Sequence, residues 1–419
     1  MRVLIISDSD WRGGAAKVAF YLAQGLRGRG IEADMLVQQK SSDADFVEEL
    51  PQQTKQPGTV MRRLQYRLAY GALQLSSLNG RVALDPDRLA RYDLVHLHNV
   101  PPMSLWDVFR RLRIPTVWTV HSMAPLTGNC VFSYDCDRWT HGCGACPQFG
   151  TWPLIYQHRD ASAEILRIKR FLYKRMAFHA VGVSDWTTTQ IAQSVMASQP
   201  RHTVQNPSWT PDYHPVDRGA ARKRLGIPEN ALAVMLSVSG KTEDTRKGLD
   251  ISVAAARQIQ NDWPDAERLF LLPTGIVAPN GEMANILNEF KGLPPKHVAD
   301  VALLRDYYNA ADVVWHPSRA DTSSMVSLEA FGAGTPVIAA AVGGVPEIVQ
   351  HEQSGLLIPP DAPEALAAAT RRLIDQPALM AQLRQGALAT AQKHNPERFV
   401  DEYLAIYDQA LADKTPNAA

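Results

Sequence analysis

Residues 321–347 read DTSSMVSLEAFGAGTPVIAAAVGGVPE. Two small-residue turns, Gly332-Ala333-Gly334 and Gly343-Gly344, flank a short apolar run from Pro336 to Ala341. Glycine lets the backbone approach a ligand closely, and a helix that starts beside it offers free N–H groups. A carboxylate can accept two hydroxyl groups at once. Such carboxylates stand at Asp321, Glu329 and Glu347. The stretch therefore favours a ligand rich in hydroxyls and negative charge, such as a sugar nucleotide, over an ordinary turn of an α/β protein.

Apolar runs alternate with helical patterns on both sides of this stretch. The run from Val313 to His316 precedes it, and the run from Val337 to Ala340 lies within it; both are predicted to be buried strands. Further strands are predicted at 233–238 and 268–272, and helices at 249–259, 304–311, 324–331, 363–393 and 399–411. Strands that alternate with helices are typical of a parallel sheet covered by helices.

The N-terminal half repeats this pattern. Residues 1–7 predict a buried strand, the Gly13-Gly14 turn follows, and 15–28 have the apolar period of a helix. Strand, glycine turn, helix and strand form a βαβ unit, which implies a parallel sheet with right-handed crossovers. Further strands are predicted at 33–37, 91–98, 116–120 and 180–183, and helices at 105–112 and 161–178.

Chain length and composition predict two domains. A chain of 419 residues is longer than one ordinary hydrophobic core supports. We therefore expect an α/β protein of two Rossmann-like, doubly wound domains that face each other across a cleft and bind ligands at the carboxyl ends of their strands. The expected domains are 1–210, which carries a cysteine-rich loop at 122–150, and 211–396. The last segment, 397–419, is predicted to be a helix that packs back on the first domain.

Charge and hydropathy narrow the function classes. The formal net charge is +0, so no overall field attracts nucleic acid, and nucleic acid is not expected as a partner. The apolar start, Val3 to Ile6, is too short for a signal peptide, and no apolar run is long enough to cross a bilayer. We expect a cytoplasmic protein that works in solution or at the inner face of the membrane.

Two basic, partly apolar segments bear on membrane contact. Residues 61–75 and 167–175 mix arginine and lysine with leucine, tyrosine and phenylalanine. Either segment could rest on anionic lipid near a polyprenyl-linked acceptor. An ordinary helix with a solvated basic face explains the same pattern equally well.

The stretch quoted above resembles the signature of retaining glycosyltransferases of family 4, which have the two-domain GT-B fold. In that family a glutamate, seven residues and a second glutamate face the donor sugar and the nucleotide ribose. Here Glu329 stands at the second position and Asp321 at the first. The resemblance extends over nearly the whole chain, through Gly13-Gly14, Val183-Ser184, Asn206-Pro207, Lys247-Gly248, Gly343 to Val349 and Ser354 to Leu357.

The resemblance implies transfer of a hexose from a nucleoside-diphosphate sugar, with UDP or GDP as the nucleotide, to a glycan or lipid-linked sugar. Attack from the front face, with the leaving phosphate as base, needs no catalytic metal. The first domain would take the acceptor and the second the donor. The expected catalytic residues are His121, Asp321 and Lys247. The expected donor-binding residues are Gly13, Gly14, Lys241, Lys247, Ser324 and Glu329.

Two departures from the family pattern keep other functions open. Asp321 is shorter by one methylene than the usual glutamate, and Lys241 stands where many members carry arginine, which replaces a bidentate phosphate contact by a point charge. A catalytically weak scaffold that only binds sugar nucleotides is one alternative. A sugar-nucleotide epimerase of the same architecture is the other, although the signature around Glu329 argues against it.

The four cysteines of the chain lie in one loop, at Cys130, Cys136, Cys143 and Cys146. The final C-x-x-C is a common half-site for zinc, and four cysteines suit a tetrahedral structural zinc ion. Two disulfides or four free thiols are the alternatives. A similar loop with the pattern GCG-x-CP occurs in relatives that extend polysaccharides, and this resemblance points to an exopolysaccharide or colanic-acid type branch.

Overall fold

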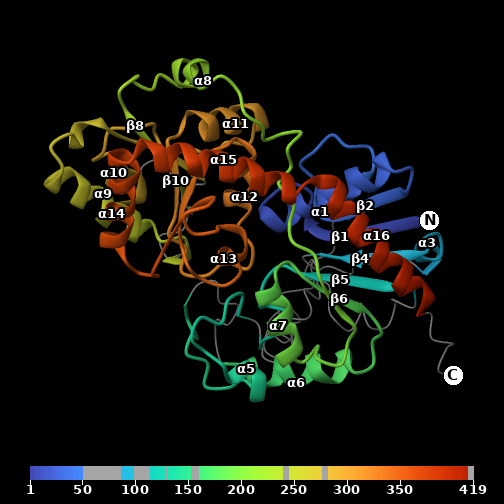
Figure 1. The fold of residues 1–419 in the computed structure, drawn as a ribbon. Coiled ribbons are helices and arrows are strands. Elements are labelled where there is room, and N and C mark those ends of the chain that lie inside the picture. The colour runs from blue at the N-terminus through green and yellow to red at the C-terminus, as the bar shows by residue number, and fades with distance from the viewer. Residues whose placement is uncertain are drawn as a thin grey trace, which may run out of the picture. The chain divides into compact units, whose positions relative to one another are not determined.

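The structure is a computed structural model, and it describes residues 1–50, 86–98, 114–128, 130–151, 160–238, 245–275 and 282–413. The chain divides into two compact units (Figure 1). The N-terminal unit comprises Met1–Asn206 together with Glu397–Ala419, and the C-terminal unit comprises Pro207–Pro396. The first unit is therefore discontinuous in sequence, because the last segment of the chain belongs to it.

The N-terminal unit is built on a parallel sheet with the strand order β3-β2-β1-β4-β5-β6-β7. Its centre is apolar, since Val3 to Ile6 in β1 are fully buried. The strands are β1 (Arg2–Ser9), β2 (Glu32–Gln39), β3 (Val47–Glu49), β4 (Leu94–Leu97), β5 (Thr116–Val120), β6 (His179–Gly182) and β7 (Arg201–Thr203). A strand buried on both faces must be continuously apolar, which explains the β1 sequence.

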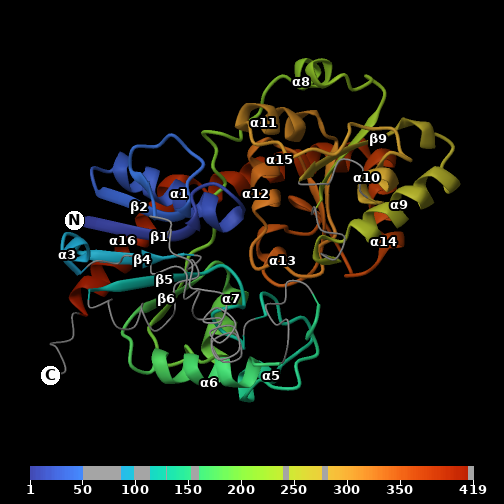
Figure 2. The same ribbon diagram turned by 180° about the vertical axis from the view of Figure 1, so that it is seen from behind.

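Helices cover this sheet, and one of them comes from the end of the chain. The helices are α1 (Gly14–Gly28), α3 (Pro86–Leu89), α5 (Arg138–His141), α6 (Ser162–Tyr173), α7 (Asp185–Gln193) and α16 (Pro396–Ala412). Both ribbon views show α16 beside β1 and β4 (Figures 1 and 2). Its Tyr407 hydroxyl lies 2.7 Å from Nδ1 of His96 in β4, and Asp401 pairs with Arg29 at 3.0 Å. Polar bonds as well as apolar packing hold the last helix on the first unit.

The C-terminal unit has a second parallel sheet, with the order β12-β11-β10-β8-β9. The strands are β8 (Leu232–Val238), β9 (Leu269–Gly275), β10 (Val313–His316), β11 (Val337–Ala340) and β12 (Gly355–Ile358). Its helices and helical turns are α8 (Arg218–Leu225), η1 (Thr245–Lys247), α9 (Leu249–Asp262), η2 (Ala266–Arg268), α10 (Glu282–Leu287), α11 (Val301–Ala310), α12 (Met325–Gly332), α13 (Val345–Ile348), α14 (Pro363–Asp375) and α15 (Pro377–Lys393). Two doubly wound α/β units confirm the predicted fold class.

Some elements differ from the prediction. The single helix predicted over 363–393 is two helices, because Pro377 has no N–H to continue the hydrogen-bond ladder of α14. No element was predicted between 207 and 228, but this stretch contains α8, whose N-cap Asp217 accepts a hydrogen bond from the Ala220 N–H. Strand β12, which begins at Gly355, was not among the predicted strands. The helix predicted at 105–112 lies outside the described residues.

The order of strands reverses once in each sheet. In the N-terminal unit the reversal lies between β1 and β4, and in the C-terminal unit between β8 and β10. Doubly wound sheets bind ligands beside the carboxyl ends of the strands at such a point. The loops after these four strands are therefore the places to look for a site.

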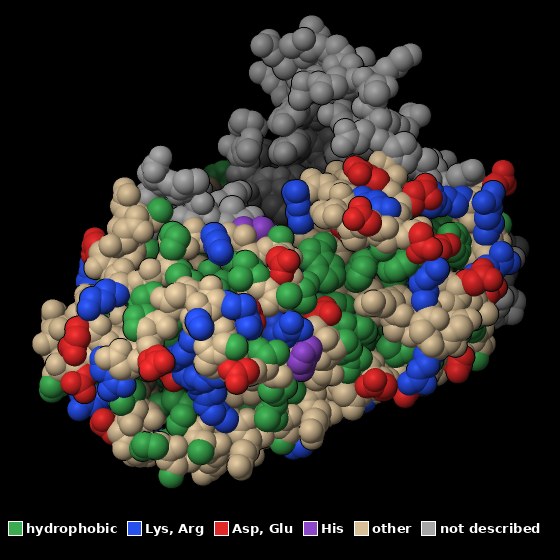
Figure 3. Space-filling model, turned by 90° about the horizontal axis from the view of Figure 1, so that it is seen from above, with side chains coloured by type: hydrophobic (Ala, Val, Ile, Leu, Met, Phe, Trp, Pro, Cys, Tyr) green, Lys and Arg blue, Asp and Glu red, His purple; other side chains and the backbone are tan. Residues whose placement is uncertain are grey.

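Two further observations concern the surface and the helices. In Figure 3, positive and negative side chains are interspersed over the visible face, in keeping with the formal net charge of +0. Among the described residues, no helix is long and apolar enough to span a membrane.

Candidate active site

The loops after β8 and β10 approach each other closely at the carboxyl edge of the C-terminal sheet. Gly248 adopts a positive φ of 65°, and a Cβ atom there would lie 2.1 Å from the carbonyl oxygen of Pro317. Gly343 has a φ of 53°, and its Cβ would lie 2.0 Å from the carbonyl oxygen of Asp321. Only glycine tolerates this combination of conformation and contact. The two glycines thus bring Lys247 and Asp321 to the same place.

Asp321 is the electrostatic centre of this edge. Its Oδ2 atom lies 3.6 Å from Nζ of Lys247 and 3.2 Å from Nε2 of His316. Burial pushes the pKa of Asp321 upward, but the neighbouring cations, Lys247 foremost, outweigh burial and hold the pKa well below its ordinary value. The carboxylate is therefore ionised at neutral pH although its side chain is only 13% exposed.

His316 was not among the predicted site residues. It is the last residue of β10 and is buried, and its Nε2 contact with Asp321 does not meet hydrogen-bond geometry. Burial lowers the pKa of His316, which favours the neutral ring. In the sequence, His316 ends a predicted strand five positions before Asp321. Several other predicted strands also end in polar residues, so this position alone did not single out His316.

Arg319 joins the loops after β8 and β10, and it too was not among the predicted site residues. Its guanidinium donates to the carboxylates of Asp250 and Asp361, with closest distances of 2.6 Å to each. The guanidinium also donates to the Thr245 carbonyl at 2.6 Å. The backbone N–H of Arg319 donates to the Arg246 carbonyl at 2.8 Å. Charge-assisted bonds of this kind fix geometry, so Arg319 holds the segment that carries Lys247.

Helix α12 carries Ser324 and Glu329. Ser324 is its N-cap: the hydroxyl accepts a hydrogen bond from the Ser327 N–H at 3.1 Å and is fully buried. Glu329 is 5% exposed and accepts a hydrogen bond of 2.6 Å from the Tyr308 hydroxyl. The helix start beside Asp321 offers N–H groups of the kind that bind phosphate. Lys241, the other predicted phosphate ligand, lies outside the described residues.

The predicted residues of the N-terminal unit lie after β1, β4 and β5. Gly13, with φ of 92°, is the N-cap of α1, and Gly14 is its first residue. His121 follows β5, and its Nε2 lies 2.9 Å from Nδ1 of His98, which follows β4. Burial lowers the pKa of His121 to about 3, so the ring is neutral at physiological pH and acts as a hydrogen-bonding group, not as a cation.

The four cysteines share one small pocket of about 20 Å³ and are all free thiols. Within the described ranges, however, no three or more His, Cys, Asp or Glu side chains are placed to hold one metal ion, so structural zinc is not supported. Burial also raises the pKa of Cys130 to about 11 and raises those of Cys143 and Cys146.

The basic face expected at 167–175 is smaller than the sequence suggested. Lys169 is buried, and its Nζ donates to the carbonyl oxygens of Ala124 at 2.6 Å and Thr127 at 2.9 Å. Phe171 is 48% exposed, and the Arg175 guanidinium lies 3.7 Å from the centre of its ring. The other basic segment, 61–75, lies outside the described residues.

Comparison with known proteins identifies the class. The family model described as Glycosyltransferase Family 4 matches residues 12–207, and the one described as Glycosyl transferases group 1 matches residues 233–376. With two doubly wound domains and these matches, the chain is a glycosyltransferase of the GT-B fold. Within that class it belongs to family 4, as the resemblance of residues 321–347 implied.

Relatives and solved structures agree with this assignment. A D-inositol 3-phosphate glycosyltransferase from Acidothermus cellulolyticus is 26% identical over 96% of this chain and 87% of its own length. Another from Catenulispora acidiphila is 36% identical, but over 48% of this chain and 49% of its own length. The sucrose-phosphate synthase of Thermosynechococcus elongatus has a TM-score of 0.71 at 20% identity over 98% of this chain and 100% of its own. The Anabaena protein HepE, solved with UDP-glucose, has a TM-score of 0.67 at 20% identity over 98% of this chain and 100% of its own.

Proposed function

We propose that this glycosyltransferase moves a hexose from a nucleoside-diphosphate sugar, with retention of configuration, to a hydroxyl of a glycan or lipid-linked sugar in exopolysaccharide synthesis. The observation that carries the proposal is the group formed by Lys247, Asp321 and His316 beside the start of α12. It combines a cation, an ionised carboxylate and the N-terminal end of a helix at a strand-order reversal.

The proposed chemistry assigns a separate task to each group. As the glycosidic bond breaks, negative charge grows on the leaving diphosphate, and the Lys247 ammonium together with the start of α12 stabilises it without a metal ion. Asp321 and Glu329 accept hydroxyl hydrogen bonds from the sugar and the ribose. A phosphate oxygen takes the proton of the attacking acceptor hydroxyl, so no protein nucleophile takes part. His121 serves as a neutral hydrogen-bonding group for the substrate.

The donor nucleotide and the acceptor are proposed from the comparisons with known proteins. A structural neighbour was solved with UDP-glucose, which supports UDP as the nucleotide. The relatives are named D-inositol 3-phosphate glycosyltransferases, so a phosphorylated polyol is the second candidate acceptor. A transfer assay tests both donor nucleotides and both candidate acceptors. UDP-glucose and GDP-mannose are each incubated with a polyprenyl-linked sugar or with D-inositol 3-phosphate, in the presence of EDTA.

The proposal expects a transferred sugar with retained anomeric configuration and undiminished turnover in EDTA. Product formed from the lipid-linked sugar supports a role in exopolysaccharide synthesis. Product formed from D-inositol 3-phosphate would instead identify a phosphorylated polyol as the acceptor. Donor binding without product would favour the scaffold. Conversion of the donor to its epimer without an acceptor would favour the epimerase.

We also propose that α6 meets an anionic membrane surface. The support is the exposed Phe171 beside Arg175, an aromatic and a cation of the kind found at bilayer interfaces. Flotation with vesicles of phosphatidylglycerol and phosphatidylcholine tests it. Binding that weakens in high salt and in Phe171→Ser supports the contact, and binding equal to that on pure phosphatidylcholine vesicles refutes it.

A further inference from the structure

A second pocket lies at the opposite edge of the C-terminal sheet, away from Lys247 and Asp321. It holds about 480 Å³, which is within the range of roughly 300–1,000 Å³ typical of small-molecule sites. Leu232 and Leu269 line it and are the first residues of β8 and β9, and Asp312 directly precedes β10. Because all these strands are parallel, the pocket is at their amino ends, whereas the proposed donor site is at their carboxyl ends.

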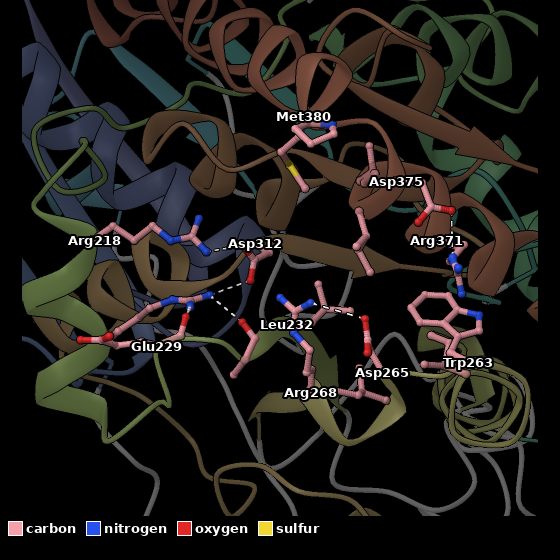
Figure 4. Close-up of a pocket in the computed structure, with 17 residues that line it drawn as sticks. Arg218, Glu229, Leu232, Trp263, Asp265, Arg268, Asp312, Arg371, Asp375 and Met380 are labelled. Atoms are coloured by element: carbon pink, nitrogen blue, oxygen red, sulfur yellow. Dashed lines mark hydrogen bonds and ion pairs between the residues drawn. The ribbon is translucent and has the colours of Figure 1, made fainter.

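Three arginines surround the Asp312 carboxylate on one side of this pocket; Arg218, Arg222 and Asp312 line the pocket together with Glu229, and Arg384 lies behind them. Figure 4 shows Arg218 and Asp312 on that side. The Asp312 carboxylate pairs with Arg218, with Arg222 at 2.6 Å and with Arg384 at 3.9 Å. In the described part of the chain, the ion pairs of these three guanidinium groups all go to this one carboxylate, so the cluster carries two positive charges more than it carries negative ones.

The crowding of cations has an electrostatic consequence. Burial and the neighbouring Arg218 lower the pKa of Arg384 to about 10, while Asp312 acts in the opposite direction. Arg222 uses its guanidinium for carbonyl oxygens of Ala310 and Glu229 as well as for Asp312. Arg218 lines the pocket with 31% of its side chain exposed, and among the described residues its guanidinium pairs with Asp312 alone. A bound anion there would relieve the repulsion.

Away from the arginines around Asp312, the charged residues that line the pocket are paired with one another. Trp263 stands there, with the Arg371 guanidinium 5.3 Å from its ring centre (Figure 4). Arg371 is paired with Asp375 at 2.8 Å, and Arg268 with Asp265 at 3.8 Å. The apolar wall between the two sides is formed by Ala231, Leu232, Ile259, Leu269, Leu373, Ile374, Pro377 and Met380.

From these observations we propose that the pocket is a second ligand site, distinct from the donor site, which binds a small amphipathic anion. The anionic group, a phosphate or carboxylate, pairs with Arg218 beside Asp312, since a guanidinium binds such groups in a bidentate manner. The apolar or aromatic body of the ligand lies along the wall that ends at Trp263. Such a ligand would bind without occupying the carboxyl edge of the sheet.

Phenyl phosphate is a suitable probe, because it joins one phosphate to one aromatic ring. We expect isothermal titration of the full-length protein to show saturable binding of phenyl phosphate, at least tenfold tighter than that of inorganic phosphate. Arg218→Gln should weaken phenyl phosphate binding at least tenfold, and Trp263→Ala should remove its advantage over inorganic phosphate. Thermal melts of both variants establish that they fold.

Two control variants make the test specific. Arg224 is on the same helix, α8, but pairs with Asp306 at 2.7 Å and does not line the pocket, so Arg224→Gln should leave phenyl phosphate binding unchanged. Lys247→Ala alters the proposed donor site and should also leave it unchanged. Absence of binding, equal weakening in Arg218→Gln and Arg224→Gln, or loss of binding in Lys247→Ala would each overturn the proposal. Loss of phenyl phosphate binding in Lys247→Ala would place the probe at the proposed donor site, and the proposed function would still stand.

Discussion

The Nζ atom of Lys247 lies 3.6 Å from the Oδ2 atom of Asp321. The two residues come from loops that follow different strands, and the contact places a cation and an ionised carboxylate at the strand-order reversal of the C-terminal sheet. The Lys247 charge helps to hold the pKa of Asp321 below its ordinary value, so the carboxylate is ionised before a substrate arrives. This pairing is the basis of the first prediction.

Lys247→Ala should lower kcat by roughly 100- to 1,000-fold, the usual cost of removing one group that stabilises charge in a transition state. The loss of a partly buried ion-pair partner should also lower the free energy of unfolding, by about 1–3 kcal/mol. Steady-state kinetics and urea unfolding measure the two effects. The exposed Lys223→Ala is the control, with neither effect expected. Near-normal kcat in Lys247→Ala would remove the proposed role.

Gly343→Ala should destabilise the protein and disturb the position of Asp321. The positive φ of 53° and the 2.0 Å approach of a Cβ atom to the Asp321 carbonyl both oppose a side chain. The expected loss is on the order of 3 kcal/mol. Gly28, at the end of α1, has open space around its Cβ position, so Gly28→Ala should raise stability by a few tenths to about 1 kcal/mol. Equal melting temperatures for the two variants would contradict the argument.

Tyr308→Phe should lower the free energy of unfolding by about 1–3 kcal/mol, because it removes the 2.6 Å hydrogen bond to the buried Glu329 carboxylate. The neighbouring residue supplies a matched control. The Tyr307 hydroxyl is buried without a hydrogen-bond partner in the described residues, so Tyr307→Phe should be neutral or stabilising. Chemical denaturation of both variants decides, and a larger loss in Tyr307→Phe would refute the prediction.

Acid should destabilise the N-terminal unit through its buried histidines. Burial lowers the pKa values of His96 and His98 well below the ordinary value of about 6.5. The unfolded chain therefore binds more protons below that pH, and stability that is complete above pH 6.5 falls as the pH decreases. At pH 5 each histidine should cost roughly 2 kcal/mol.

Urea unfolding between pH 5 and 8 measures this slope. His98→Gln removes one titrating group, so its stability should depend less steeply on pH than that of the wild type. The exposed His141→Gln is the control and should keep the wild-type slope. Equal slopes in all three proteins would show that the buried histidines are not the cause.

Local sequence signals predicted most of the fold. Strands β5, β10 and β11 have the predicted bounds, because a buried parallel strand is a short, continuous apolar run that needs no distant information. Helix α8 was missed because its sequence, RGAARKRL, has almost no apolar period, and packing and its Asp217 cap determine it instead. The break between α14 and α15 was readable at Pro377, but the alanine-rich pattern on both sides concealed it.

The site was predicted less completely than the fold. The motif resemblance pointed to Lys247 and Asp321, and the structure places their side chains 3.6 Å apart. The contact of His316 with Asp321 and the clamp formed by Arg319 depend on which loops meet at the sheet edge. Pairings between distant side chains leave no periodic trace in one sequence. The balance of charge around Asp312 depends in the same way on α8, β10 and α15 meeting in space.

Helix α16 gives the chain an order of assembly. During synthesis the ribosome releases every residue of the C-terminal unit before it releases Glu397–Ala419, which complete the N-terminal unit. Until then His96 lacks the Tyr407 hydroxyl that lies 2.7 Å from its Nδ1 atom, and the helix beside β1 and β4 is missing. The N-terminal unit is thus synthesised first but completed last. A nascent chain that stops before α16 has an incomplete N-terminal unit, which chaperones and proteases can bind.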